Sequence, residues 1–209
     1  MNTSEHPIFL KSIEYIRSQI SLTGLDQVQQ SILERIIHAS GDLRLQSSLR
    51  FSPRACEDAT SALKNGAKIL TDTRMAEAAI SPMAKRTLNS DVQSIFDMKS
   101  KSYDFISTTR SAVAMQTIWM DLEKKDDLPE SPIVVIGSAP TALMALLDLI
   151  EQGRKKPSLI IGMPVGFIGV SESKARLLNR DISHIVLESS KGGASLAAAT
   201  INALLKAAV

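Results

Sequence analysis

Cysteine and histidine are scarce in this chain of 209 residues. The single cysteine, Cys56, excludes an internal disulfide and any structural zinc site that needs several thiolates. We therefore expect a protein of a reducing compartment, the cytoplasm. The three histidines, His6, His38 and His184, are scattered, without an H-E-x-x-H pattern or a carboxylate at metal-ligand spacing. We expect no catalytic metal held by the protein.

Aromatic residues and long apolar runs are also few. Aromatics make up 4% of the chain, which argues against a site built mainly on aromatic stacking. No segment reaches the roughly 18 apolar residues that span a bilayer, and the closest, 194–209, is broken by Asn202 and Lys206. The first residues lack the positive start and apolar core of a signal peptide. We expect no association with a membrane.

The charge of the chain has no strong sign. With 24 basic and 22 acidic residues the net charge is +2, too even for a protein that coats nucleic acid. Any anionic ligand must be held by a local site. Apolar residues make up 44% and charged residues 22%, the balance of a folded soluble protein, and the length suits one domain spanning 1–209.

Alternating strand and helix patterns fill the second half of the chain. The apolar run IVVI (133–136) precedes a helical stripe formed by Leu143, Leu147 and Ile150, and Gly153 is a suitable stop. LIIG and a helix at 172–178 follow, then SHIVLESS and a helix at 194–209. Units this short predict an α/β fold: a mostly parallel sheet flanked by helices, with ligands beyond the carboxyl ends of its strands.

The first half of the chain is more helical. We predict helices over 8–20, 26–37 and 53–65, and one strand in AKILTDT (67–73) that joins the same sheet and brings Asp72 to the same rim. The pattern is weakest over 82–131. Its charged segment EKKDDLPES is expected to be a solvated connection.

Small residues follow three of the predicted strands, at 137–141, 162–169 and 189–193. Glycines let backbone N–H groups approach a ligand, and helix N-termini add positive charge, so the loops are candidates for an anion-binding rim. The alternative is that glycine only permits tight turns. None of the loops matches G-x-x-x-x-G-K-[ST] or G-x-G-x-x-G, which disfavours an enzyme that uses ATP or NAD.

Three further residues are candidates for chemistry. His38 ends the apolar run of Val28, Ile32 and Ile36 but lies about 200° around the helix from Ile36, and a histidine, with an ordinary pKa near 6.5, suits proton transfer. Its alternative role is to meet free carbonyls at the helix end. Arg110, between Thr109 and Ser111, suits a carboxylate, although most arginines face solvent. Cys56 is interpreted as a buried structural thiol rather than a nucleophile.

Six ordered blocks together resemble the precorrin-8X methylmutase family, which includes cobalt-precorrin-8 methylmutases, over nearly the whole chain. They are RIIHASGD (35–42), RFSPRACEDATSALKNGAKILTDTRMAEAAI (50–80), TRSAVAM (109–115), GSAPTAL (137–143), GMPVGFIGVSESK (162–174) and KGGASLAAATINALL (191–205). The sequence departs from the usual family residues at three positions: Ser138 replaces Asn, Ala79 replaces Gly, and Ile13 replaces an aromatic residue.

The resemblance implies an α/β homodimer that moves a methyl group from C-11 to C-12 of a corrin precursor. The product is hydrogenobyrinic acid, or its cobalt form cobyrinic acid, and neither a cofactor nor an external methyl donor is needed. Carried over by motif, His38 is the acid–base residue, and the substrate contacts are Ser12, Ser81, Arg110 and Ser111. Two alternatives stay open: a corrinoid carrier without activity, and a nucleotide-using α/β enzyme.

Overall fold

A computed structural model describes residues 6–97, 108–124 and 128–209. The helices are α1 (Pro7–Gln19), α2 (Gln27–Ser40), α3 (Ala55–Lys64), α4 (Arg74–Arg86), α5 (Arg110–Glu123), α6 (Pro140–Glu151), α7 (Val170–Leu178), α8 (Ala194–Ala207) and the 3-10 helix η1 (Leu43–Ser48). The strands are β1 (Leu49–Phe51), β2 (Ile69–Thr71), β3 (Val92–Ser94), β4 (Ile133–Ile136), β5 (Leu159–Gly162) and β6 (His184–Leu187).

The strands form one sheet in the order β1-β6-β5-β4-β2-β3. All neighbours pair in parallel except β1, which runs antiparallel to β6 at the edge, with Leu49 opposite Leu187. The predicted α/β class with a mostly parallel sheet is confirmed. Because β1 runs against the other strands, it starts at the rim where they end, and this brings the end of α2 to that rim.

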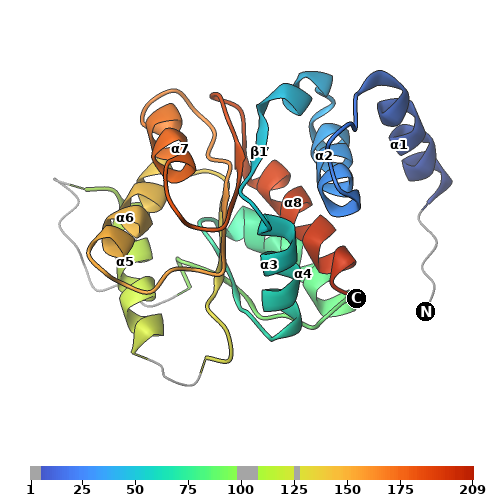
Figure 1. Ribbon diagram of the computed structural model, residues 1–209. Helices are drawn as coiled ribbons and strands as arrows, with labels where there is room; N and C mark the ends of the chain where they lie inside the picture. The colour runs from blue at the N-terminus through green and yellow to red at the C-terminus, as the bar shows by residue number, and fades with distance from the viewer. Residues whose placement is uncertain (1–5, 98–107, 125–127) are drawn as a thin grey trace.

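Helices cover both faces of the sheet (Figure 1). Side chains alternate along each strand, so Ile133 and Val135 of β4 face one core and Val134 and Ile136 face the other. The first core is covered by α3, α4 and α8, with α2 packed on α8 and α1 on α2. The second core is covered by α5, α6 and α7.

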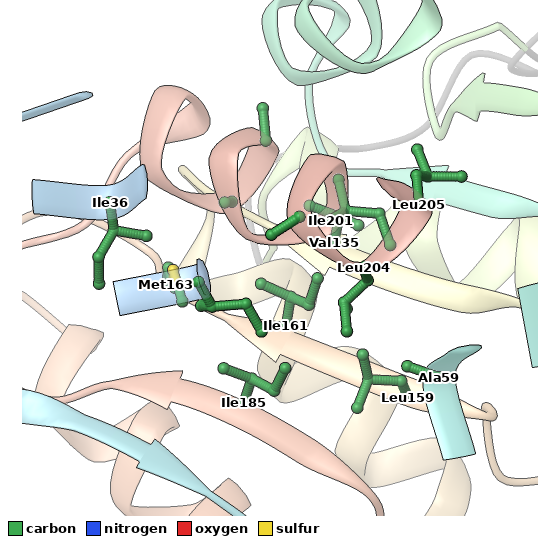
Figure 2. Packing of buried hydrophobic residues seen from close by; sticks show 14 of the residues in the cluster. Ile36, Ala59, Val135, Leu159, Ile161, Met163, Ile185, Ile201, Leu204 and Leu205 are labelled. Carbon is green, nitrogen blue, oxygen red and sulfur yellow. The ribbon is translucent and has the colours of Figure 1, made fainter. Parts of the chain in front are cut away.

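The centre of the first core lies between α8 and the sheet (Figure 2). Val135, Ile161 and Ile185 project from three neighbouring strands toward Ile201 and Leu204 of α8, and all five side chains are fully buried. Each such side chain contributes about 1.5–3 kcal/mol through its removal from water. The helix that follows the 189–193 loop is therefore anchored firmly, which fixes the start of α8 at the rim.

The helices predicted over 8–20, 26–37 and 53–65 and the strand within 67–73 are confirmed, with ends shifted by a few residues. Helices α4 and α5 and strands β1 and β3 are not among the predicted elements. Helix α4 contains Pro82, which normally disfavours a helix interior. Strands β1 and β3 have three residues each and little apolar pattern.

The charged segment 123–131 is only partly a connection. Residues 125–127 lie outside the described residues. The prediction is wrong for Glu123, which ends α5 and whose Oε1 accepts a hydrogen bond of 2.6 Å from the backbone N–H of Lys155. Within the described ranges, no helix is long and apolar enough to cross a membrane.

Candidate active site

The carboxyl ends of β2 and β4 mark the point in the sheet where this topology normally binds ligands. The chain leaves β2 through α4 on one face of the sheet and leaves β4 through α6 on the other. The fully buried carboxylate of Asp72, which follows β2, lies at this point. Its Oδ1 accepts a hydrogen bond of 3.0 Å from the N–H of Gly137, and its Oδ2 accepts two of 2.7 Å from Ser138 and Ala139.

Asp72 therefore caps α6 from another strand. Ala139, at the N-cap position of α6, has no side chain that can accept a hydrogen bond. Burial raises the pKa of the Asp72 carboxyl, and the three N–H donors act in the opposite direction. The anion-binding interpretation of the 137–141 loop is wrong for these three N–H groups, because the anion that they hold belongs to the protein.

The loops after β5 and β6 approach each other too closely for a side chain. A Cβ atom at Gly192 would lie 2.1 Å from the carbonyl oxygen of Met163 and 2.7 Å from that of Pro164. Glycine is required at position 192 by this close approach of two loops of the protein, and not by a positive φ in a tight turn. The N-termini of α7 and α8 have no side-chain cap, so the anion-binding interpretation stays a prediction there.

His38 is exposed in the last turn of α2, whereas Ile36 is fully buried, which confirms the predicted orientation. Its ring and the Phe9 ring of α1 form a T-shaped pair, with 5.0 Å between centroids and 75° between planes. The Arg35 guanidinium lies 5.1 Å from the centroid of Phe9. The contact with Phe9 joins α1 and α2, and no local sequence motif predicts it.

The end of α2 is joined to the loop after β6. The ammonium of Lys191 forms an ion pair with the carboxylate of Asp42, which also accepts a hydrogen bond of 2.8 Å from Nε of Arg44. The two cations hold the pKa of Asp42 well below its usual range. The blocks RIIHASGD and KGGASLAAATINALL, far apart in the chain, therefore meet in the fold.

Arg110 and Ser111 are the first residues of α5, at the N-terminus of that helix. Thr109 caps α5, and its hydroxyl donates a hydrogen bond of 2.7 Å to the Thr141 hydroxyl at the start of α6. The start of α5 is thus tied to the Asp72-capped helix. The Arg110 guanidinium is exposed and lies 5.5 Å from the centroid of the Phe96 ring.

Ser12 and Ser81 lie half-buried within α1 and α4. Each hydroxyl donates to the carbonyl one turn earlier, Ser12 to Ile8 at 3.0 Å and Ser81 to Glu77 at 2.7 Å. Across the described ranges, no hydrogen bond or ion pair joins His38 to Ser12, Ser81, Arg110 or Ser111. Their joint contact with one substrate stays a prediction.

The other histidines have structural places. His184 is buried in β6, with Nδ1 2.8 Å from the Ile182 carbonyl oxygen, and burial lowers its pKa, as the packing interpretation requires. His6 is exposed, as predicted, and caps α1 by accepting a hydrogen bond from Ile8 N–H. Among the described residues, no cluster of three or more histidine, cysteine or acidic side chains could hold a metal ion.

Cys56 is buried in α3, with 4% of its surface exposed, as predicted. Burial raises the pKa of its thiol to about 12, so the reactive thiolate is scarce even at pH 9. We expect iodoacetamide to label native protein at pH 8 very slowly and urea-unfolded protein within minutes, followed by intact mass. Fast, complete labelling of the native protein would contradict the structural interpretation of Cys56.

The comparisons with known proteins agree on one family. The family profile described as precorrin-8X methylmutase matches residues 7–207. The precorrin-8X methylmutase of Pseudomonas aeruginosa is 38% identical over 207 residues, covering 94% of this chain and 93% of that protein. The cobalt-precorrin-8 methylmutase of a Synechocystis species is 34% identical, covering 96% and 95%.

A solved structure gives the same result for the fold. The crystal structure of the precorrin-8X methylmutase from Thermus thermophilus superposes with a TM-score of 0.82 at 30% identity, covering 97% of this chain and 98% of that one. Sequence and fold thus agree over almost the full length of both proteins. The chain belongs to the precorrin-8X methylmutase family.

Proposed function

We propose that this protein moves a methyl group from C-11 to C-12 of precorrin-8X or cobalt-precorrin-8, with His38 as the acid–base group. The observation that carries the proposal is the family match over residues 7–207, with relatives of both substrate names. The protein is an isomerase of cobalamin biosynthesis: the methyl group leaves one carbon and joins another of the same molecule. No second substrate has to supply it.

The reaction needs a proton in the right place. A methyl group shifts along a conjugated ring system only when that system is in the correct tautomer, and a proton on a ring nitrogen selects the tautomer. His38 is exposed at the rim of the sheet, where a bound macrocycle can reach it. It donates a proton to the nitrogen of ring C, which bears the migrating methyl group, and later helps to remove one.

The substrate is a broad apolar macrocycle with many peripheral carboxylates, so several weak anchors orient it better than one phosphate cradle. The exposed guanidinium of Arg110 is suited to one carboxylate. The uncapped N-termini of α7 and α8 are suited to others. Ser12, Ser81 and Ser111 supply hydroxyl groups for the remaining contacts.

Arg110→Ala is expected to raise the Kd for the substrate by about tenfold, the loss of one charge-assisted hydrogen bond. The chemistry of the bound substrate should change much less, because the guanidinium does not transfer the proton. Equilibrium titration and single-turnover kinetics separate the two effects. Arg154→Ala is the matched control, since Arg154 lies after α6 and pairs with Glu123 at the end of α5. Equal Kd values for wild type and Arg110→Ala would refute the role.

The direct test is incubation of the purified protein with precorrin-8X and, separately, with cobalt-precorrin-8. An isomerised product, identified by its visible spectrum and by NMR, supports the proposal and shows which substrate is preferred. The alternative, a corrinoid carrier, predicts tight binding with an unchanged carbon skeleton. That outcome would overturn the catalytic assignment.

The functional unit that we propose is a cytoplasmic homodimer with the substrate near the subunit boundary. His38 and Arg110 are exposed on the single chain, which leaves this surface open to a second subunit that would cover a bound macrocycle. The loop after β5 also exposes two apolar side chains, Phe167 at 89% and Ile168 at 88%. Analytical ultracentrifugation tests this point, because a mass of one 22.6 kDa chain would exclude the dimer.

A further inference from the structure

Lys174 is a cation kept in the interior of the protein. It lies in α7, is 1% exposed, and forms no ion pair with a carboxylate of the described residues. Its Nζ donates two hydrogen bonds to backbone carbonyl oxygens, 2.8 Å to Ser189 and 2.7 Å to Lys191. Burial lowers the pKa of Lys174 to about 8. Burial of a charge without a counter-ion costs free energy, and the two hydrogen bonds to the loop offset part of this cost. Holding the loop is therefore the structural role of Lys174.

The loop that Lys174 holds has a strained and well-defined backbone. Ser189 adopts a φ of +74°, which is unusual for a residue other than glycine. The N–H of Gly166 donates to the Ser190 carbonyl at 3.0 Å, and that of Gly193 donates to the Met163 carbonyl at 2.9 Å. The bonds from Lys174 fall on both sides of Ser190, so they fix the backbone from which the Lys191 side chain departs.

Lys191 carries this constraint to α2 through its ion pair with Asp42. The turn between Asp42 and His38 is itself closely bonded. Gly41 ends α2 in the left-handed region, with a φ of +66°. Its N–H donates a hydrogen bond of 2.8 Å to the Ile37 carbonyl. The N–H of Asp42 is also held in place, because it donates a hydrogen bond of 3.1 Å to the hydroxyl of Ser40. A displacement of Asp42 is therefore transmitted to the last turn of α2.

We propose that Lys174 is a positioning residue for His38: it holds the loop after β6, Lys191 of this loop holds Asp42, and Asp42 fixes the end of α2 that carries the imidazole. The inference rests on the proposed function, in which His38 is the acid–base group. Lys174 itself is too deeply buried to touch the substrate. It acts on the reaction only through the placement of His38.

The variant Lys174→Met keeps the length and the apolar stem of the side chain but removes both hydrogen bonds to the loop. We expect kcat to fall about 10- to 100-fold, because small displacements of a catalytic group cost this much, while KM changes little. Lys156→Met is the matched control. Lys156 also donates to a backbone carbonyl, that of Asp181 at 2.6 Å, but it lies ahead of β5 at the other end of the sheet. Its kcat should equal that of wild type.

Two variants at half-buried positions outside the core test the relay without disturbing the interior. Lys191→Met and Asp42→Asn should each lower kcat, and the double variant should be no slower than the slower single variant, because both break the same connection. In NMR spectra the ring C–H resonance of His38, assigned by its loss in His38→Ala, should shift in Lys174→Met and Lys191→Met but not in Lys156→Met. If Lys174→Met does not fold, Lys191→Met and Asp42→Asn carry the test.

The outcomes separate this inference from the function on which it rests. A higher KM with unchanged kcat in Lys174→Met would overturn it, because Lys174 would then act by attracting substrate carboxylates. A lower Tm with wild-type kcat and an unshifted His38 resonance would overturn it too, because the role would be structural only. If His38→Ala is inactive while all three relay variants turn over normally, only the relay fails. If His38→Ala is active, the acid–base assignment fails first.

Discussion

His38→Ala is expected to lower turnover by about 10²- to 10⁴-fold, the usual contribution of one general acid–base group. Binding of the substrate should stay close to that of wild type, because the carboxylate anchors lie on other elements. The fold should survive, since His38 is exposed and alanine is a better helix former. Single-turnover conversion of enzyme-bound precorrin-8X, followed by the visible spectrum, measures the effect.

His6→Ala provides the matched control for this experiment. His6 is also exposed, and its removal costs only the cap of α1. The control should therefore convert substrate at the wild-type rate, with a loss of about 1 kcal/mol in the free energy of unfolding because the cap of α1 is removed. Conversion by His38→Ala at a rate similar to that of the control would show that another group, or the substrate itself, moves the proton.

Gly192→Ala should give the largest loss of stability among single small substitutions in the rim loops. The new Cβ would meet the backbone oxygens of Met163 and Pro164 at 2.1 Å and 2.7 Å, and backbone cannot rotate away as a side chain can. We expect a loss of about 3 kcal/mol in the free energy of unfolding and a fall in Tm of about 10 °C. Urea denaturation and thermal unfolding measure the two quantities.

Gly162→Ala is the matched control, because its Cβ would also be crowded but by movable atoms. The nearest are Cδ2 of Leu177 at 2.8 Å and Cγ2 of Val186 at 3.5 Å, both at the ends of side chains. The control should lose less than half as much stability as Gly192→Ala. Equal losses in the two variants would mean that the loops after β5 and β6 can separate easily, contrary to the close packing described above.

The fold of the second half follows from its sequence because each unit carries two signals at once. The runs IVVI, LIIG and HIVL are apolar on both faces, as buried parallel strands require, and each precedes a helix. Helix α5 also has a helical stripe, formed by Met115, Ile118, Trp119 and Leu122, although it is not among the predicted elements. The Pro82 inside α4 is different: its helix depends on packing against α8, which only the fold provides.

The position of a site residue was predictable only where it depends on a single helix or strand. The helical period placed His38 on the exposed side of α2, and a polar residue after a buried strand placed Asp72 at the rim. Contacts between elements were not predictable, because they depend on the order of the strands. Asp72 is 65 residues from Gly137, and Asp42 is 149 residues from Lys191. At such separations along the chain, no sequence pattern indicates which residue will be the partner.

The carboxylate of Asp72 has a consequence for selectivity in the cell. An inorganic phosphate or a nucleotide that approached the carboxyl end of β4 would compete with an acid tethered to the same polypeptide, whose effective concentration is of millimolar order or more. A free anion therefore gains little binding energy from the N-terminus of α6, because its N–H groups already donate to Asp72. Anionic groups of a ligand are thereby directed to the N-termini of α7 and α8, which no side chain caps.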